Sequence, residues 1–225
     1  MPQAIIIDAP DVLTDESAND KEAIALVRQI VATAGVRVSE QALQQAEAFA
    51  VDSFAPHEYD AMIFKLVNRD ATLALRCISA FKKNFNAKPN LRKEAKALLE
   101  ACKARGWKTA LAAAPSAELA TALQKAGAWN LLDVKGPPAA MKIELPDPRL
   151  LEFVVGLLGM MPADCALLGT RIDNDIRPAK AMRMTAIHLR VGRHGQRQLP
   201  RDLRDVPDYE AADVAGLVNL IPMVT

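Results

Sequence analysis

The chain has 225 residues, of which 51% are hydrophobic and 24% are charged, and its 28 Lys and Arg nearly balance its 27 Asp and Glu. At roughly 100–200 residues per domain, this length allows one large domain, or one domain that carries a smaller insertion. The composition excludes a disordered chain, and the charge balance provides no electrostatic basis for binding nucleic acid. Because only 4% of the residues are aromatic, mainly aliphatic side chains must fill the interior, as is typical of helices on a buried parallel sheet.

The cysteines indicate a reducing compartment, and the apolar segments match neither a signal peptide nor a membrane span. Cys77, Cys102 and Cys165 are odd in number and far apart, with no spacing that suits a disulfide framework or a zinc site. The short apolar run before Asp8 lacks the basic and long apolar regions of a signal peptide. The most apolar later stretch, residues 153–161, is too short to cross a bilayer. We therefore expect a cytoplasmic protein without a membrane partner.

The first part of the chain predicts one strand and then only helices. Residues 4–7 are a continuous Ala and Ile run that meets Asp8, which predicts a buried strand followed by a loop. From residue 15 to 88 the apolar residues recur at helical spacing, with Ser39 as a predicted N-cap, until Pro89 ends the pattern.

After Pro89 helices and strands alternate. Helices are expected over residues 92–105, 117–126, 148–158, 175–182 and 212–220, and strands over residues 109–113, 129–134, 165–168 and 185–189. This order predicts an α/β protein with a doubly wound, parallel, Rossmann-like sheet in residues 1–14 and 89–225 and an inserted helical cap in residues 15–88. Ligands of such sheets bind beyond the carboxyl ends of the strands.

The loops at those strand ends carry four short motifs. They are residues 5–13 (IIIDAPDVL), 106–114 (GWKTALAAA), 145–148 (LPDP) and 168–176 (LGTRIDNDI). In order and spacing, over nearly the whole chain, they resemble the motifs of the haloacid dehalogenase (HAD) superfamily, subfamily I, whose members carry an α-helical cap after the first strand. The resemblance implies that Asp8 is a nucleophile. It also implies that Mg²⁺ is held by Asp8, by the backbone carbonyl of Pro10 and by an acidic residue of the fourth motif, here Asp175 or Asp173.

Four chemical positions depart from the resemblance. The acid/base of the phosphatases is replaced by Pro10, the hydroxyl residue of the second motif by Ala113, the lysine of the third by Leu145, and the first acidic residue of the fourth by Thr170. Losing one preorganised donor typically costs about 10²–10³ in rate, and losing a general acid or base about 10²–10⁴. These departures favour a HAD-like pseudoenzyme, which binds a small-molecule ligand or a protein partner.

The alternative is an active hydrolase, namely an Mg²⁺-dependent small-molecule phosphatase with Asp8 as nucleophile. Lys142 would then replace the missing lysine, and Asp11 would be a displaced acid. The simpler interpretation makes Lys142 a solvated loop charge, Asp11 a turn residue and Asp175 the cap of the next helix.

Two further segments bear on ligand binding. Thr170 and Arg171 precede a predicted helix, whose N-terminus suits an anion, so with Lys142 they are the candidate substrate-binding residues. A 2-haloacid dehalogenase is less favoured, because Ala113 and Leu145 remove the hydroxyl and the lysine that it also needs. The Arg-rich residues 190–204 are expected to form a solvated loop.

Overall fold

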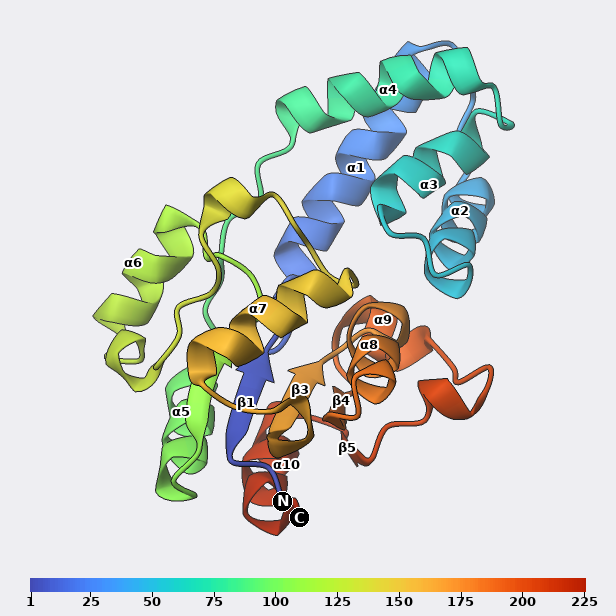
Figure 1. Ribbon diagram of the computed structural model, residues 1–225. Helices are drawn as coiled ribbons and strands as arrows, with labels where there is room; N and C mark the ends of the chain where they lie inside the picture. Colours follow the sequence, from blue (N-terminus) through green and yellow to red (C-terminus); the bar gives the residue numbers. More distant parts are fainter. The chain divides into compact units, whose positions relative to one another are not determined.

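The computed structural model describes all 225 residues, which divide into two compact units. One unit combines Met1–Asp15 with Pro89–Thr225, and the other is Glu16–Lys88. Both chain termini belong to the first unit, where they lie close together (Figure 1). We call the first unit the sheet unit and the second the helical unit.

The sheet unit contains five parallel strands in the order β2-β1-β3-β4-β5. The strands are β1 (Ala4–Ile7), β2 (Lys108–Leu111), β3 (Cys165–Gly169), β4 (Thr185–Leu189) and β5 (Tyr209–Ala211). From β1 the chain proceeds to β2 on one side and later to β3 on the other, so the strand order reverses between β1 and β3, as in other doubly wound sheets. The prediction of an α/β fold with a parallel, doubly wound sheet is confirmed.

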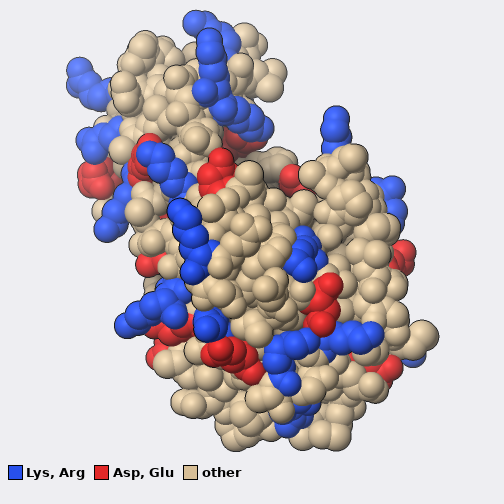
Figure 2. All heavy atoms as spheres, turned by 90° about the vertical axis from the view of Figure 1, so that its left-hand side faces the viewer, with Lys and Arg blue, Asp and Glu red and all other residues tan.

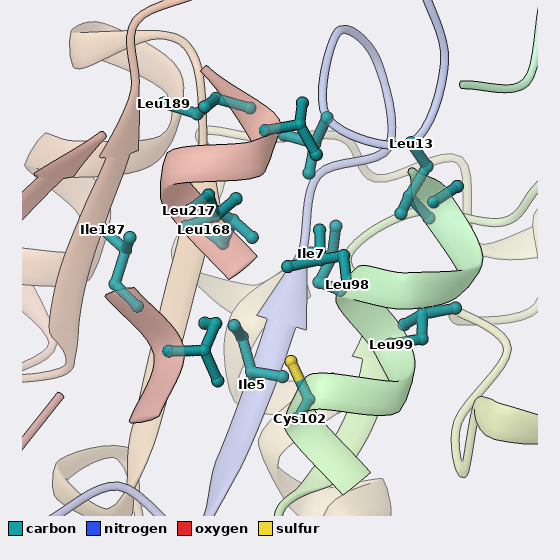
Figure 3. Packing of buried hydrophobic residues seen from close by; sticks show 14 of the residues in the cluster. Ile5, Ile7, Leu13, Leu98, Leu99, Cys102, Leu168, Ile187, Leu189 and Leu217 are labelled. Carbon is teal, nitrogen blue, oxygen red and sulfur yellow. The ribbon is translucent and has the colours of Figure 1, made fainter. Parts of the chain in front are cut away.

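Helices cover both faces of this sheet, which is why the central strands β1 and β3 read as continuous apolar runs. Alternate strand residues such as Ile5, Ile7 and Leu168 pack against α5 (Ala95–Ala104) and α10 (Val214–Leu220), as Figure 3 shows. The opposite face buries Ile6 and Leu167. There α7 (Pro148–Leu158) crosses the sheet, as Figure 1 shows. Five of its aliphatic side chains are buried.

The remaining elements of the sheet unit agree only in part with the sequence pattern. Helix α6 (Ala117–Lys125) is capped by the Ser116 hydroxyl, as expected, whereas the predicted strand over residues 129–134 is wrong. That segment forms the turn Trp129–Leu131, and Val134 makes only an isolated bridge to Ala110. The carboxylate of Asp133 accepts the N–H of Thr109 at 2.7 Å, so a side chain occupies a donor that a longer strand would use.

The Arg-rich stretch is more ordered than a solvated loop. It contains α9 (Gly192–Arg197) and the turn Leu203–Asp205, and it leads into β5, a strand that the polar sequence around Tyr209 did not indicate. Helix α8 (Arg177–Ala181) precedes β4.

The helical unit consists of α1 (Ser17–Thr33), α2 (Glu40–Asp52), α3 (Glu58–Leu66) and α4 (Ala71–Asn84). The expected absence of strands from this segment is confirmed, and Ser39 caps α2 by accepting the N–H of Ala42 at 3.1 Å. The helices share a core of their own around Val27, Met62 and Ile63. Its role as a cap stays a prediction.

The helices and the surface add two observations. None of the helices combines the length and apolar character needed to cross a membrane. Both acidic and basic side chains are scattered over the face of the molecule in Figure 2, and the formal net charge of the chain is +1.

Candidate active site

Asp8 lies at the carboxyl edge of the sheet, at the point where the strand order reverses. Its backbone N–H donates to the carbonyl of Leu168 at 2.9 Å, and the N–H of Ala112 donates to the carbonyl of Ile7 at 2.8 Å. These bonds extend the ladders of β1 on both sides, so the backbone of Asp8 is fixed by the sheet itself. The side chain is only partly exposed and lies beside the loop that follows β3.

Asp175 reaches the same edge from the turn Ile172–Ile176, which has a π-helical hydrogen-bond pattern. Its carboxylate is fully buried and accepts the backbone N–H of Arg171 at 2.8 Å, so it folds back toward β3 and does not cap α8. A Cβ atom on Gly169 would come within 2.1 Å of an oxygen of this carboxylate. A glycine at the end of β3 is therefore what allows Asp175 to lie against the sheet.

Asn174 joins the two carboxyl groups. Its amide nitrogen lies 3.5 Å from an oxygen of Asp8 and 3.1 Å from an oxygen of Asp175. Burial, followed by the neighbouring charge of Asp175, holds the pKa of Asp8 well above its usual value, and the charge of Arg171 opposes this shift only in part. Burial also raises the pKa of Asp175. Two acidic groups thus share a poorly solvated position with one nearby guanidinium.

Asp173 is engaged elsewhere. One of its oxygens accepts the side-chain amide of Gln198 at 2.8 Å, and the other accepts the guanidinium of Arg171 at 2.7 Å. Of the two acidic residues predicted as metal ligands, Asp175 is therefore the one placed beside Asp8, whereas Asp173 orients Arg171.

Pro10 and Asp11 lie in the turn that follows Asp8. Pro10 is exposed, and no backbone hydrogen bond of this turn ends on its carbonyl oxygen. Asp11 has a φ of 59°, and its carboxylate lies over Gly192, where a Cβ atom would meet a carboxylate oxygen at 2.1 Å. Arg92 holds the turn by donating to the backbone carbonyls of Asp11 and Thr14 at 2.9 and 3.0 Å.

The remaining sequence candidates contribute little to the surroundings of Asp8. Ala113 is exposed, and Leu145 is half-buried. Lys142 is exposed at the end of the turn Ala139–Met141, and no hydrogen bond or ion pair joins it to Asp8. Thr170 is buried, and its backbone carbonyl lies 3.2 Å from the Nε2 atom of His188.

Sequence reasoning missed the roles of Asn174 and Gln198. Asn174 stands between two candidate acids within the fourth motif, and this position was a usable signal. No local pattern marks Gln198, because its partners lie far away in the chain.

The donor set suits a hard divalent cation. The carboxylates of Asp8 and Asp175 and the carbonyl of Pro10 are oxygen donors, which Mg²⁺ prefers, and a cation would favour the ionised form of both acids. No group of three or more His, Cys, Asp and Glu side chains is placed to hold a metal ion. Water would have to complete the coordination, as is usual for Mg²⁺ in proteins.

Comparisons with known proteins agree with this fold. No family model matches the chain. The glyceraldehyde 3-phosphate phosphatase of Methanopyrus kandleri is 32% identical over 79 residues, which are 35% of this chain and 34% of that protein, so only about a third of the relative's length is matched.

Solved structures match over the whole length. A predicted phosphatase from Clostridium acetobutylicum has a TM-score of 0.68 at 16% identity and covers 100% of both chains. A HAD phosphatase from Thermococcus onnurineus has a TM-score of 0.58 at 18% identity and covers 98% of each. Dehalogenases are also among the similar structures. The chain has the fold of the HAD phosphatases and dehalogenases.

Proposed function

We propose that this protein hydrolyses phosphate monoesters of small molecules, with Asp8 as the nucleophile and Mg²⁺ as the cofactor. The observation that carries the proposal is the pairing of Asp8, at the end of β1, with the buried Asp175 beyond the end of β3. This pair occupies the edge at which doubly wound sheets bind their ligands. The name of the Methanopyrus kandleri relative supports a small phosphorylated metabolite as the class of substrate.

Asp8 performs the central chemical step in this proposal. A carboxylate oxygen attacks phosphorus, the bond from phosphorus to the leaving oxygen breaks, and water then releases inorganic phosphate from the aspartyl phosphate and restores the carboxylate. When bound, Mg²⁺ neutralises charge on the phosphoryl oxygens. Asp175 is held by the N–H of Arg171 and, with Asn174, keeps Asp8 oriented.

Pro10 limits the leaving groups that this site can expel. Proline has no proton to give, and the carboxylate of the next residue, Asp11, lies over Gly192. In this proposal the leaving oxygen therefore takes its proton from water. A missing general acid typically costs about 10²–10⁴ in rate, and the cost is smallest for leaving groups that are stable as anions. We expect aryl phosphates to react much faster than alkyl phosphates.

A second candidate function is ligand binding without turnover. It is favoured by Ala113 and Leu145, which stand at the motif positions where the resemblance to the HAD superfamily implies a hydroxyl residue and a lysine. Under this alternative, a phosphorylated molecule or a protein partner would bind at the same edge of the sheet and remain unchanged.

A hydrolysis assay with matched variants separates the two functions. Wild type, Asp8→Asn and Asp164→Asn are incubated with p-nitrophenyl phosphate and a panel of alkyl phosphates, with Mg²⁺ or with chelator. Asp164 is a suitable control because it is half-buried at the opposite edge of the sheet, next to the start of β3. The proposal expects Mg²⁺-dependent turnover by wild type and Asp164→Asn and none by Asp8→Asn.

Thermal unfolding supplies a readout that does not need turnover. At 100 times its dissociation constant, a ligand that binds only the folded state stabilises it by about 2.7 kcal/mol. Mg²⁺ should therefore raise the melting temperature of wild type and not that of Asp8→Asn. Turnover that survives Asp8→Asn, or its absence from wild type over the whole panel, contradicts hydrolysis. Binding of orthophosphate by wild type without turnover supports the second function.

A further inference from the structure

A buried glutamine connects the Arg-rich segment to the candidate site. The side chain of Gln198, which follows α9, is 3% exposed. Its amide oxygen accepts the backbone N–H of Ile172 at 2.7 Å, and its amide nitrogen donates to Asp173 at 2.8 Å. Both ends of one amide are thus bonded to the turn that carries Asp175. This side chain accepts from an N–H and donates to a carboxylate at the same time. It therefore needs both an acceptor and a donor, which an amide supplies.

The contacts continue from Gln198 to the acidic pair. Asp173, held by Gln198, accepts the guanidinium of Arg171 at 2.7 Å. The backbone N–H of Arg171 donates to Asp175 at 2.8 Å, and Asn174 bridges Asp175 and Asp8. Every member of this chain of contacts is at least partly buried, so solvent competes weakly with each bond.

A second anchor lies further along the same segment. Asp205 is fully buried and accepts two nitrogens of Arg177, at 2.8 and 2.9 Å, and the backbone N–H of Arg201 at 2.9 Å. Because Arg177 is the first residue of α8, directly after the turn Ile172–Ile176, residues 198–205 hold that turn at both of its ends.

We propose that Gln198 is a positioning residue of the site, which fixes the turn at Ile172–Ile176 so that Asp175 and Asn174 meet Asp8. The inference rests on the proposed function for its effect on turnover, but the arrangement that it describes is measurable without any reaction. The Arg-rich segment is then part of the framework of the site.

Three variants test this role. Gln198→Leu removes donor and acceptor at similar volume. Gln198→Glu keeps an acceptor for Ile172 but places a second carboxylate against Asp173. Gln196→Leu makes the first change two residues earlier, at an exposed position of α9, and is the matched control.

The first readout is local and needs no metal or substrate. The Ile172 amide should exchange its hydrogen at least about tenfold faster in Gln198→Leu than in wild type, because a buried donor loses its acceptor. The side-chain amide signals of Asn174 in nitrogen–proton NMR spectra should shift in the same variant. Neither should change in Gln196→Leu. Faster exchange at Ile172 with unchanged Asn174 signals would mean a purely local structural role and would overturn the proposal.

The second readout separates positioning from general stability through pH. In Gln198→Glu the two facing carboxylates repel at neutral pH, and one proton shared between them at acidic pH replaces the lost hydrogen bond. The Asn174 signals of this variant should therefore approach those of wild type as the pH falls, with both proteins compared at the same pH. Gln198→Leu should show no such recovery. A failure of Gln198→Glu to recover would contradict the role of the Asp173 contact.

The third readout links the turn to the reaction. In Gln198→Leu, Mg²⁺ affinity measured by calorimetry and kcat for p-nitrophenyl phosphate should each fall at least about tenfold, while KM changes little. If wild type neither binds Mg²⁺ nor turns over substrate, the proposed function fails, and the exchange and NMR readouts still decide the role of Gln198. Identical behaviour of Gln198→Leu and Gln196→Leu in all three readouts would overturn that role.

Discussion

Replacing Asp205 by alanine should destabilise the sheet unit far more than replacing Asp202 by alanine. Asp205 has no exposed surface and bonds to two nitrogens of Arg177 and to the N–H of Arg201. Asp202 forms a similar pair with Arg204, but the two side chains are 39% and 73% exposed. The two substitutions therefore each remove a carboxylate, one from a buried ion pair and one from an exposed ion pair.

The expected magnitudes follow from burial. Breaking a buried ion pair by removing one partner costs about 3–5 kcal/mol, because an uncompensated charge is left behind. The Arg177 side chain is 34% exposed and can regain some hydration, so the lower end, about 3 kcal/mol, applies to Asp205→Ala. Exposed pairs contribute about 0–1 kcal/mol, so Asp202→Ala should cost much less than Asp205→Ala.

Urea unfolding followed by tryptophan fluorescence measures this difference. Both tryptophans of the chain, Trp107 and Trp129, lie in the sheet unit, so their emission reports the unfolding of the unit that contains Asp205. The free energy of unfolding is obtained for wild type and both variants from the same linear extrapolation. Equal costs for the two substitutions, within about 0.5 kcal/mol, would refute the reasoning from burial.

Two other predictions concern the site and the glycines. Because the pKa of Asp8 is raised in the folded chain, the unfolded chain ionises first as the pH rises, so this group contributes stability at low pH that is lost toward neutrality. In metal-free buffer Asp8→Asn should thus be more stable than wild type at pH 7. Urea titrations should show that the difference in free energy of unfolding between the two proteins disappears toward about pH 4. A difference that does not depend on pH would contradict the raised pKa. Gly192→Ala should cost about 2–3 kcal/mol, because φ is +66° and the Asp11 carboxylate occupies the place of a Cβ, whereas Gly156→Ala, which meets nothing within 4 Å inside α7, should gain about 0.5–1 kcal/mol in the same urea assay. If both glycine variants changed the free energy of unfolding in the same direction, this explanation would be contradicted.

Local pattern was sufficient for most of the fold. The apolar run before Asp8, the caps at Ser39 and Ser116, and the helical spacing through residues 15–88 all agree with the structure, because each depends on neighbours within one or two turns. The strand expected over residues 129–134 fails for a non-local reason: Asp133 takes the N–H of Thr109, 24 residues earlier, with its side chain. Strand β5, with three residues, is too short to show a periodicity.

The positions of the site residues likewise depend partly on local sequence and partly on distant residues. The position of Asp8 follows from β1, which precedes it. The candidate residues Thr170, Arg171, Asp173 and Asp175 all lie in one short segment after β3. Which of these acids meets Asp8 depends on Gln198, 25 residues beyond Asp173, whose amide holds Asp173 on Arg171 and leaves Asp175 to pair with Asp8. A buried hydrogen bond of this kind depends on which side chains the folded backbone brings together. The pattern of residues around Gln198 therefore does not predict it.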